Sequence, residues 1–251
     1  MLPCRHVGAD TLPLLGLWYA VFLLSLTCHE AAHAFVAWQG GDPTAYEAGQ
    51  VSLSPWPHIQ REPWGTVLVP LLTFFMYAGS GSPWMMGWAS APYDPVWEHR
   101  HPRRAAVMAL AGPVANLALV GLAFAVLAGL FSAGVLVRPE LELLGIDRLA
   151  VAAPGASPVF DGLARLLSIL LSLNLLLCVF NLMPCPPLDG ASVLAGVLPV
   201  ARTLRDRLRA SPFGSMVAFV VALILFPRVV APWVFAPLWL SVLRALYDFA
   251  G

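Results

Sequence analysis

The segment from Leu14 to Trp38 is an almost unbroken apolar run, and it limits the possible folds more than any other part of the chain. About 20 apolar residues are enough for a helix to cross a bilayer. The run nevertheless carries His29, Glu30 and His33 in its second half, with no Lys or Arg inside it to neutralise them. Because ionisable side chains inside an apolar span are costly, the segment predicts a transmembrane helix with a functional site built into it.

These three polar residues form the pattern His-Glu-x-x-His. On a helix, positions i and i+4 lie one turn apart on the same face, so the imidazoles of His29 and His33 can reach one metal ion. Glu30 can lie beside that metal and accept a proton from water without being a ligand. The alternative is a chance match in which the histidines are ordinary core residues. The clustering of three polar groups without a neighbouring cation favours a metal site.

The composition of the whole chain agrees with a membrane location. Of the 251 residues, 59% are hydrophobic and 11% are charged, with a mean hydropathy of +0.76. Soluble domains have about 25% charged residues, and the apolar runs are too numerous to be one signal peptide. We therefore expect an all-α polytopic membrane protein with about five to six membrane segments. The formal net charge is zero, without a basic stripe or tail, so nucleic acid is not an expected partner.

A second unusual sequence follows the apolar segment 159–180. It starts at Asn181 and contains three prolines within residues 184–187, just before Asp189. Broken backbone at membrane depth is tolerated only where protein buries it or water lines it. The Asp189 carboxylate needs a cation, but no Lys or Arg is nearby. It is either a simple N-cap residue or the third member, with His29 and His33, of a two-histidine, one-carboxylate catalytic zinc site.

Two short segments are expected near this site. Residues 64–80 are apolar but at the lower limit for a span, and Gly65 and Pro70 interrupt them, so we predict a re-entrant segment. The residues from Gln50 to Ser54 alternate between polar and apolar, which is the period of a strand. We therefore predict a short β-hairpin whose edge, formed by Val51, Ser52 and Leu53, pairs with an extended peptide. The alternative for this segment is an ordinary connecting loop.

The rest of the sequence predicts a single membrane domain over residues 1–251 with its core over about 14–200. In the long apolar stretch 105–137, Asn116 can form a hydrogen bond across to a neighbouring helix. Residues 202–209 contain four arginines on a short helix, which suits contact with anionic lipid headgroups of the membrane. The apolar stretch 212–247 has several internal prolines and predicts a helical hairpin of two short spans.

With both motifs in this order, the chain resembles the site-2 protease family of intramembrane zinc metalloproteases, in its compact branch without PDZ or CBS domains. The resemblance covers roughly residues 20–195. It rests on His29-Glu30-x-x-His33 and Asn181-x-x-Pro184-x-x-Pro187-Leu188-Asp189-Gly190, with further matches at Gly41–Thr44, 48–58, Gly65-Thr66, Gly87-Trp88 and Ala111–Asn116.

This resemblance implies one Zn2+ ion held by His29, His33 and Asp189, with Glu30 as the catalytic base. It implies hydrolysis of peptide bonds in transmembrane protein substrates, as in regulated intramembrane proteolysis. It also implies that Asn181, His58 and Asn116 support the substrate or the developing oxyanion. One departure is Gln60, where the family often has an aspartate two residues after the position of His58.

Two functions from different classes fit these features. The first is an intramembrane zinc metalloendopeptidase. The second is a catalytically silent membrane binding protein or metal carrier that retains the protease fold. Glu30 separates them, because a carrier needs ligands but no general base, and its presence favours the enzyme.

The positive charges predict the orientation in a prokaryotic cell (inner) membrane. Basic clusters at 100–104 and 202–209 are expected to face the cytoplasm. Two spans lie between them, so the 138–158 connector is expected outside. If residues 64–80 are re-entrant, the N-terminus is outside and the metal site lies nearer the cytoplasm.

Overall fold

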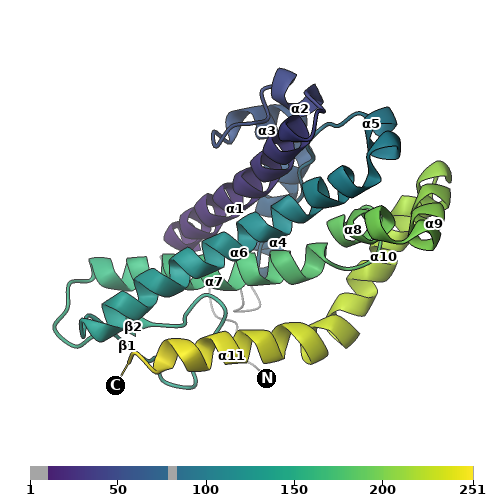
Figure 1. Cartoon of the computed structure of the whole chain (residues 1–251). Helices are drawn as coiled ribbons and strands as arrows, with labels where there is room; N and C mark the ends of the chain where they lie inside the picture. Colours follow the sequence, from purple (N-terminus) through teal and green to yellow (C-terminus); the bar gives the residue numbers. More distant parts are fainter. Residues whose placement is uncertain (1–10, 79–83, 251) are drawn as a thin grey trace.

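The computed structural model describes residues 11–78 and 84–250, and it is built around long apolar helices (Figure 1). Within these residues, four helices are long and apolar enough to cross a membrane. They are α1 (Thr11–Gln39), α6 (Pro102–Ser132), α7 (Val159–Asn181) and the continuous helical stretch Gly214–Tyr247. The expectation of an all-α polytopic membrane protein is confirmed, because each of these helices exceeds the length of about 20 residues that a bilayer requires.

Helices α1, α6 and α7 form the core of the bundle. Met108 and Asn116 of α6 contact His33 and His29 of α1 respectively, so these two helices run in opposite directions. Helix α7 is the most enclosed, with 61% of its most apolar stretch buried, against 6% for the C-terminal helix. The apolar core lies toward the N-terminal half of α1, and its largest side chains include Trp18, Phe22, Leu127 and Leu171. On α1, this core therefore precedes the polar cluster of His29, Glu30 and His33.

Short helices gather at the end of the bundle where α1 and α7 finish and α6 begins (Figure 1). They are α2 (Thr44–Glu47), α3 (Trp56–Arg61), α5 (Pro95–Arg100), α8 (Asp189–Val197) and α9 (Pro199–Ala210). The end of α1 is fixed to α5, because the Trp97 indole nitrogen donates to the Gly40 carbonyl oxygen at 3.0 Å. We call this the polar end of the bundle.

The connector between α6 and α7 lies at the opposite end. It contains the two-stranded antiparallel sheet of β1 (Leu136–Val137) and β2 (Val151–Ala152), in which Leu136 pairs with Ala152. The Arg138 guanidinium donates to the Tyr247 carbonyl oxygen at 2.6 Å, so the C-terminal helix also ends here. As predicted, the 138–158 connector and the two arginine-rich segments lie at opposite ends.

Residues 64–78 enter the bundle from the polar end as η1 (Trp64–Leu68) and α4 (Val69–Ala78). The chain then returns alongside them: the Met86 amide donates to Thr73 Oγ1 at 3.0 Å, and the Trp88 amide donates to the Gly65 carbonyl oxygen at 3.1 Å. Gly65 is required for this approach, because a Cβ there would collide with the Trp88 backbone and ring. Both arms therefore start and finish at the same end, which is the arrangement predicted for a re-entrant segment. Residues 79–80 of the predicted segment lie outside the described residues.

The predicted β-hairpin at Gln50–Ser54 is wrong, because this segment is irregular. Local side chains hold it instead of a partner strand. The Ser54 amide donates to Ser52 Oγ at 3.1 Å, and the His58 ring nitrogen Nε2 lies 3.2 Å from the Ser52 carbonyl oxygen. Serine hydroxyls that bond to nearby backbone compete with strand pairing in this way. The alternating pattern does not match the exposure of the side chains either, because the polar Gln50 is buried and the apolar Leu53 is exposed.

The predicted C-terminal hairpin is also wrong. Helix α10 (Gly214–Leu225), η2 (Phe226–Phe235) and α11 (Ala236–Tyr247) follow each other without a turn and form one bent helix. The prolines at 227, 232 and 237 are five residues apart and fall in or beside the wider π-helical turns of η2. Local π-helical adjustments let a membrane helix continue past proline, and no Gly or Asn is present between these prolines to form a turn.

Candidate metal centre and active site

His29 and His33 point from α1 toward the first residue of α8. Both histidines are buried, with 7% and 8% of their surface exposed. Their Nε2 atoms lie 3.0 Å apart, and they lie 3.1 and 3.3 Å from the two carboxylate oxygens of Asp189. These three residues are the one group in the described chain whose ligand atoms all lie close enough to hold one metal, within 4.8 Å of one another.

The proline-rich loop after α7 brings Asp189 to the histidines. Asp189 is the first helical residue of α8, while Leu188 occupies the N-cap position, so the carboxylate is not a simple helix cap. Gly190 has to be glycine, because a Cβ there would collide with the Leu182 backbone as the chain turns back. Asp189 Oδ2 is buried and has no hydrogen-bond partner within the described residues. A buried carboxylate oxygen without a donor requires a cation.

The far nitrogens of the two rings are already bonded. His33 Nδ1 lies 2.7 Å from the Met108 carbonyl oxygen, and His29 Nδ1 lies 2.6 Å from Asn116 Oδ1. An oxygen can only accept, so a neutral ring carries its proton on Nδ1 and presents an electron pair at Nε2. Two such Nε2 atoms 3.0 Å apart cannot form a hydrogen bond with each other. They and the carboxylate are three electron-pair donors that converge on one point, and this set fits a zinc ion.

Gly112 of α6 closes the other side of this point. A Cβ at this position would overlap Nε2 of both histidines. The absence of a side chain leaves a small cradle in front of the nitrogens. The donor set and the cradle together fit a bound metal ion.

Glu30 follows His29 on α1 and is also buried, with 6% of its surface exposed. Among the described residues, no hydrogen bond or ion pair is found for its carboxylate. Its carboxylate is therefore not engaged by another described side chain.

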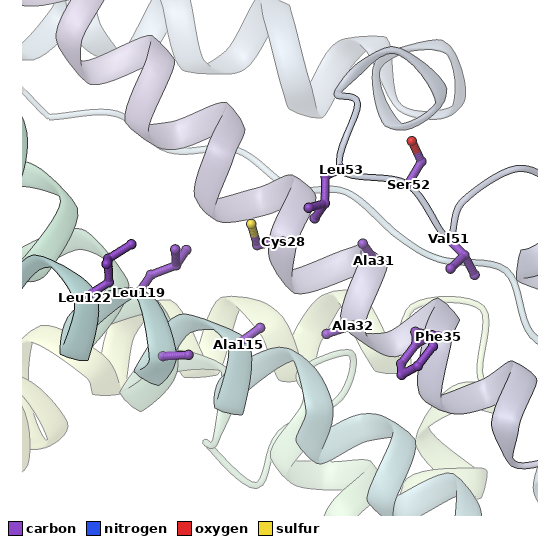
Figure 2. Close-up of a pocket in the computed structure, with 11 residues that line it drawn as sticks. Cys28, Ala31, Ala32, Phe35, Val51, Ser52, Leu53, Ala115, Leu119 and Leu122 are labelled. Atoms are coloured by element: carbon purple, nitrogen blue, oxygen red, sulfur yellow. The ribbon is translucent and has the colours of Figure 1, made fainter.

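An apolar groove of about 500 Å³ lies between α1, α6 and the loop 51–53. In Figure 2, Leu53 and Val51 lie above the outward face of α1, and Ala115 and Leu119 lie on the α6 side. Cys28 and Ala31, which line the groove, flank His29 and Glu30 in the sequence. None of His29, Glu30, His33 and Asp189 lines the groove, so it lies on a different face of α1 from the polar cluster and is open to an apolar partner.

Comparison with known proteins agrees with this geometry. A model of peptidase family M50 matches residues 18–226. The chain therefore belongs to peptidase family M50, the site-2 protease family. The curated relatives include the "Putative zinc metalloprotease YwhC" of Bacillus subtilis, 32% identical over 86% of this chain and 82% of the relative. They also include the "Putative zinc metalloprotease Rip2" of Mycobacterium tuberculosis, 29% identical over 99% of this chain and 78% of the relative.

No solved structure matches the chain significantly. The family and the relatives identify a zinc-dependent metalloprotease, and the four apolar helices make this M50 peptidase an integral membrane protein. The expected zinc cofactor and the expected protease class are thus confirmed.

The remaining predicted residues of this M50 peptidase have different surroundings in the structure. Asn116 is fully buried and bonds to His29 and Asn174, so it faces the back of a ligand and not a substrate. It does bond across to neighbouring helices, as the sequence predicts. His58 bonds to the loop at Ser52 and has a buried Nδ1 without a partner among the described residues. Asn181 is half-buried at the end of α7, directly before the loop to Asp189.

Sequence reasoning missed Asn174, Ser25 and Gly112. Asn174 and Ser25 are fully buried, and Asn174 Nδ2 donates to Ser25 Oγ at 2.8 Å. The signal was present, because an asparagine in the middle of an apolar helix requires a buried partner. Nothing in the sequence, however, indicates which partner that is.

A charged network fixes α8 and α9 to α5 at the polar end. Glu98 of α5 is buried and pairs with Arg205 at 2.5 Å and with Arg209 at 3.2 Å. Arg209 also donates to Ser192 Oγ at 3.0 Å, one turn after Asp189 on α8, and to the Tyr93 hydroxyl at 3.0 Å. Burial raises the pKa of Tyr93, which keeps this phenol neutral.

Only some of the arginines of α9 are therefore free for the predicted contact with lipid headgroups. Arg205 and Arg209 are used inside the protein, by Glu98. Arg202 donates to the Ala195 carbonyl oxygen at 3.0 Å, while Arg207 is exposed. The sequence could not separate these roles, because it does not indicate that Glu98 packs against α9.

Proposed function

We propose that this M50 peptidase hydrolyses peptide bonds of transmembrane protein segments within the membrane, with zinc held by His29, His33 and Asp189. The observation that carries this proposal is the position of the ligands. They converge inside a bundle of apolar helices and not on a soluble domain. A membrane-embedded peptide can reach this place without leaving the bilayer.

The proposed mechanism uses Glu30 as general base and general acid. Zinc, when bound, polarises the scissile carbonyl and lowers the pKa of the attacking water. The Glu30 carboxylate accepts the proton of that water and delivers it to the leaving amine. Asn181, half-buried at the end of α7, is proposed to donate to the substrate or to the developing oxyanion.

We also propose that the loop at 51–53 holds the substrate in an extended conformation. A transmembrane helix hides its peptide bonds in its own hydrogen bonds, so it has to unwind before attack. Among the described residues, no backbone hydrogen bond involves Val51 or Leu53, whereas the Ser52 carbonyl oxygen is engaged by His58. In an extended chain, alternate residues offer their backbone groups to the same side. Val51 and Leu53 are therefore free to pair with an added strand.

The proposed function is tested by Glu30→Gln in the full chain, reconstituted in lipid vesicles with single-span candidate substrates. The amide has nearly the same shape as the carboxylate but cannot accept the proton. We expect cleavage to be lost while zinc remains bound. Equal cleavage by wild type and Glu30→Gln would remove Glu30 as the base. If both proteins contain zinc and neither cleaves any substrate tested, the result would favour a silent metal-binding protein.

A further inference from the structure

Four polar side chains form a continuous hydrogen-bonded row that starts at His29 and returns to Ser25, one turn earlier on the same face of α1. His29 Nδ1 lies 2.6 Å from Asn116 Oδ1, and Asn116 Nδ2 donates to Asn174 Oδ1 at 2.8 Å. Asn174 Nδ2 then donates to Ser25 Oγ and to the Leu170 carbonyl oxygen, each at 2.8 Å. We infer that Asn174, which does not touch the metal site, is a positioning residue that acts through Asn116 to fix the proton of His29 on Nδ1.

The direction of every bond in this row follows from two backbone carbonyls. Ser25 Oγ donates to the Val21 carbonyl oxygen at 2.7 Å, so toward Asn174 it can only accept. The Leu170 carbonyl oxygen also only accepts. The Asn174 side chain must therefore turn its NH₂ group toward Ser25 and Leu170. Its Oδ1 then faces Asn116.

The same reasoning continues to the ligand. Because Asn174 Oδ1 accepts, Asn116 must present its NH₂ group to it, and so its own Oδ1 faces His29. That oxygen requires a donor, which places the ring proton of His29 on Nδ1 and the electron pair on Nε2. The Nε2 atom is the one that lies 3.1 Å from Asp189. A reversed amide at either asparagine would place the His29 proton on the nitrogen that faces the metal.

The ring proton is placed on Nδ1 of both histidines, but by different partners. His33 bonds directly to the Met108 carbonyl oxygen, which can only accept a hydrogen bond. His29 bonds to an amide, which can rotate by half a turn and exchange oxygen for nitrogen. Asn174 removes this freedom. Asn116, Asn174 and Ser25 are each fully buried, so water cannot substitute for a missing partner.

This inference rests on the proposed ligation of zinc by His29, and its test reads zinc affinity instead of cleavage. The full chain is purified in mild detergent, and the zinc dissociation constant is measured by competition with a chelator. The unfolding temperature of the zinc-free protein is measured in parallel. The variants are Asn116→Leu, Asn174→Leu and the double variant. Ser168→Ala is the control, because Ser168 is a fully buried residue of α7 whose bonds, to Leu149 and Ala164, do not lead to the metal site.

Loss of a partner that orients a ligand weakens metal binding by about 10- to 100-fold, so we expect that range for Asn116→Leu and about three- to tenfold for Asn174→Leu. Because Asn174 acts only through Asn116, the double variant should bind zinc no more weakly than Asn116→Leu. Ser168→Ala should lower the unfolding temperature and leave zinc affinity within about twofold of wild type.

The inference is overturned if Asn174→Leu binds zinc as tightly as wild type, or if the losses of the two single variants multiply in the double variant. If Asn174→Leu does not fold, Asn174→Ser replaces it. A serine at this position can bond to the carbonyl one turn back, as Ser25 and Ser168 already do, but it offers no amide to Asn116. If instead wild type binds zinc and His29→Ala binds it equally well, the proposed ligand set fails, and this result is separate from any effect of Asn174.

Discussion

At the residue scale, Gly112 is the position where adding a single methyl group would disturb both histidine ligands. A methyl group there overlaps Nε2 of both His29 and His33, and each ring is buried and hydrogen-bonded at Nδ1, so it cannot move away without breaking that bond. We expect Gly112→Ala to weaken zinc binding by at least about tenfold, as loss of ligand orientation does. Chelator competition on the purified chain measures this change.

Gly121 on the same helix is the matched control. Apart from the neighbouring backbone of its own helix, no atom lies within 4 Å of the place that a Cβ would take there. Because alanine is favoured over glycine in a helix by about 1 kcal/mol, Gly121→Ala should raise the unfolding temperature and leave zinc affinity unchanged. A Gly112→Ala protein with wild-type zinc affinity would mean that the histidines are not held in the geometry described.

The residues that the sequence made recognisable are those whose chemistry conflicts with their surroundings. His29, Glu30, His33 and Asp189 are ionisable groups that an apolar sequence has no other reason to keep. Gly112 gives no such signal, because its role depends on the side chain it lacks and on a helix that is distant in the sequence. The same holds for Asn174, whose role depends on two backbone carbonyls.

At the element scale, the buried pairing of Glu98 with Arg205 and Arg209 joins α5 to the α8–α9 unit that carries Asp189. Glu98→Gln removes the negative charge and leaves two guanidinium groups without it. We expect a loss of roughly 3–5 kcal/mol in the free energy of unfolding, as for other broken buried ion pairs. Denaturant or thermal unfolding in detergent measures it.

The pair Asp147–Arg165 is the control for this change. It is separated by 3.3 Å, but 20% and 25% of its side-chain surfaces are exposed. Because this pair is less buried than Glu98 and Arg205, whose side chains are 5% and 6% exposed, Asp147→Asn should have the smaller effect. Equal effects of the two substitutions would show that α5 is not an important support of the α8–α9 unit.

The loop 51–53 offers a second test at this scale. Val51→Pro or Leu53→Pro removes a backbone N–H that the proposed substrate strand would use. We expect either variant to lower the cleavage rate more than the zinc content. Leu53→Ala, which removes an exposed side chain and keeps the N–H, should retain more activity than Leu53→Pro. Full cleavage by both proline variants would require a different substrate clamp.

The sequence predicted long helices reliably and short connections poorly. Helices α1, α6 and α7 are long apolar runs, whose length alone determines the structure. The segment 50–54 has the period of a strand, but a strand also requires a partner. The Ser52 carbonyl oxygen is instead bonded to His58, a contact that the sequence could not predict. In the C-terminal segment, three prolines suggested a turn. Their spacing of five residues instead matches a π-helical stretch.

At the scale of the whole molecule, both arginine-rich segments and the metal ligands lie toward one end, and the connector with β1 and β2 lies at the other. The positive-inside rule then gives the proposed orientation, with the polar end in the cytoplasm. We expect a single cysteine placed at the exposed Ser157 to react with an impermeant thiol reagent added outside intact cells. A cysteine at the exposed Glu47 should react only after the membrane is opened.

These labelling experiments use a background without native cysteines that retains activity. Reaction at Glu47→Cys from outside, with protection at Ser157→Cys, would reverse the orientation. The predicted position of the N-terminus concerns residues 1–10, which lie outside the described residues.

Zinc content per chain tests the central claim most directly. Elemental analysis of the full chain, purified in detergent, should give about one zinc per chain for wild type and for Glu30→Gln, as expected for two histidines and a carboxylate. His33→Ala and Asp189→Ala should each lose the metal, because each leaves only two protein ligands. Full zinc content in both ligand variants, or none in wild type, would contradict the account.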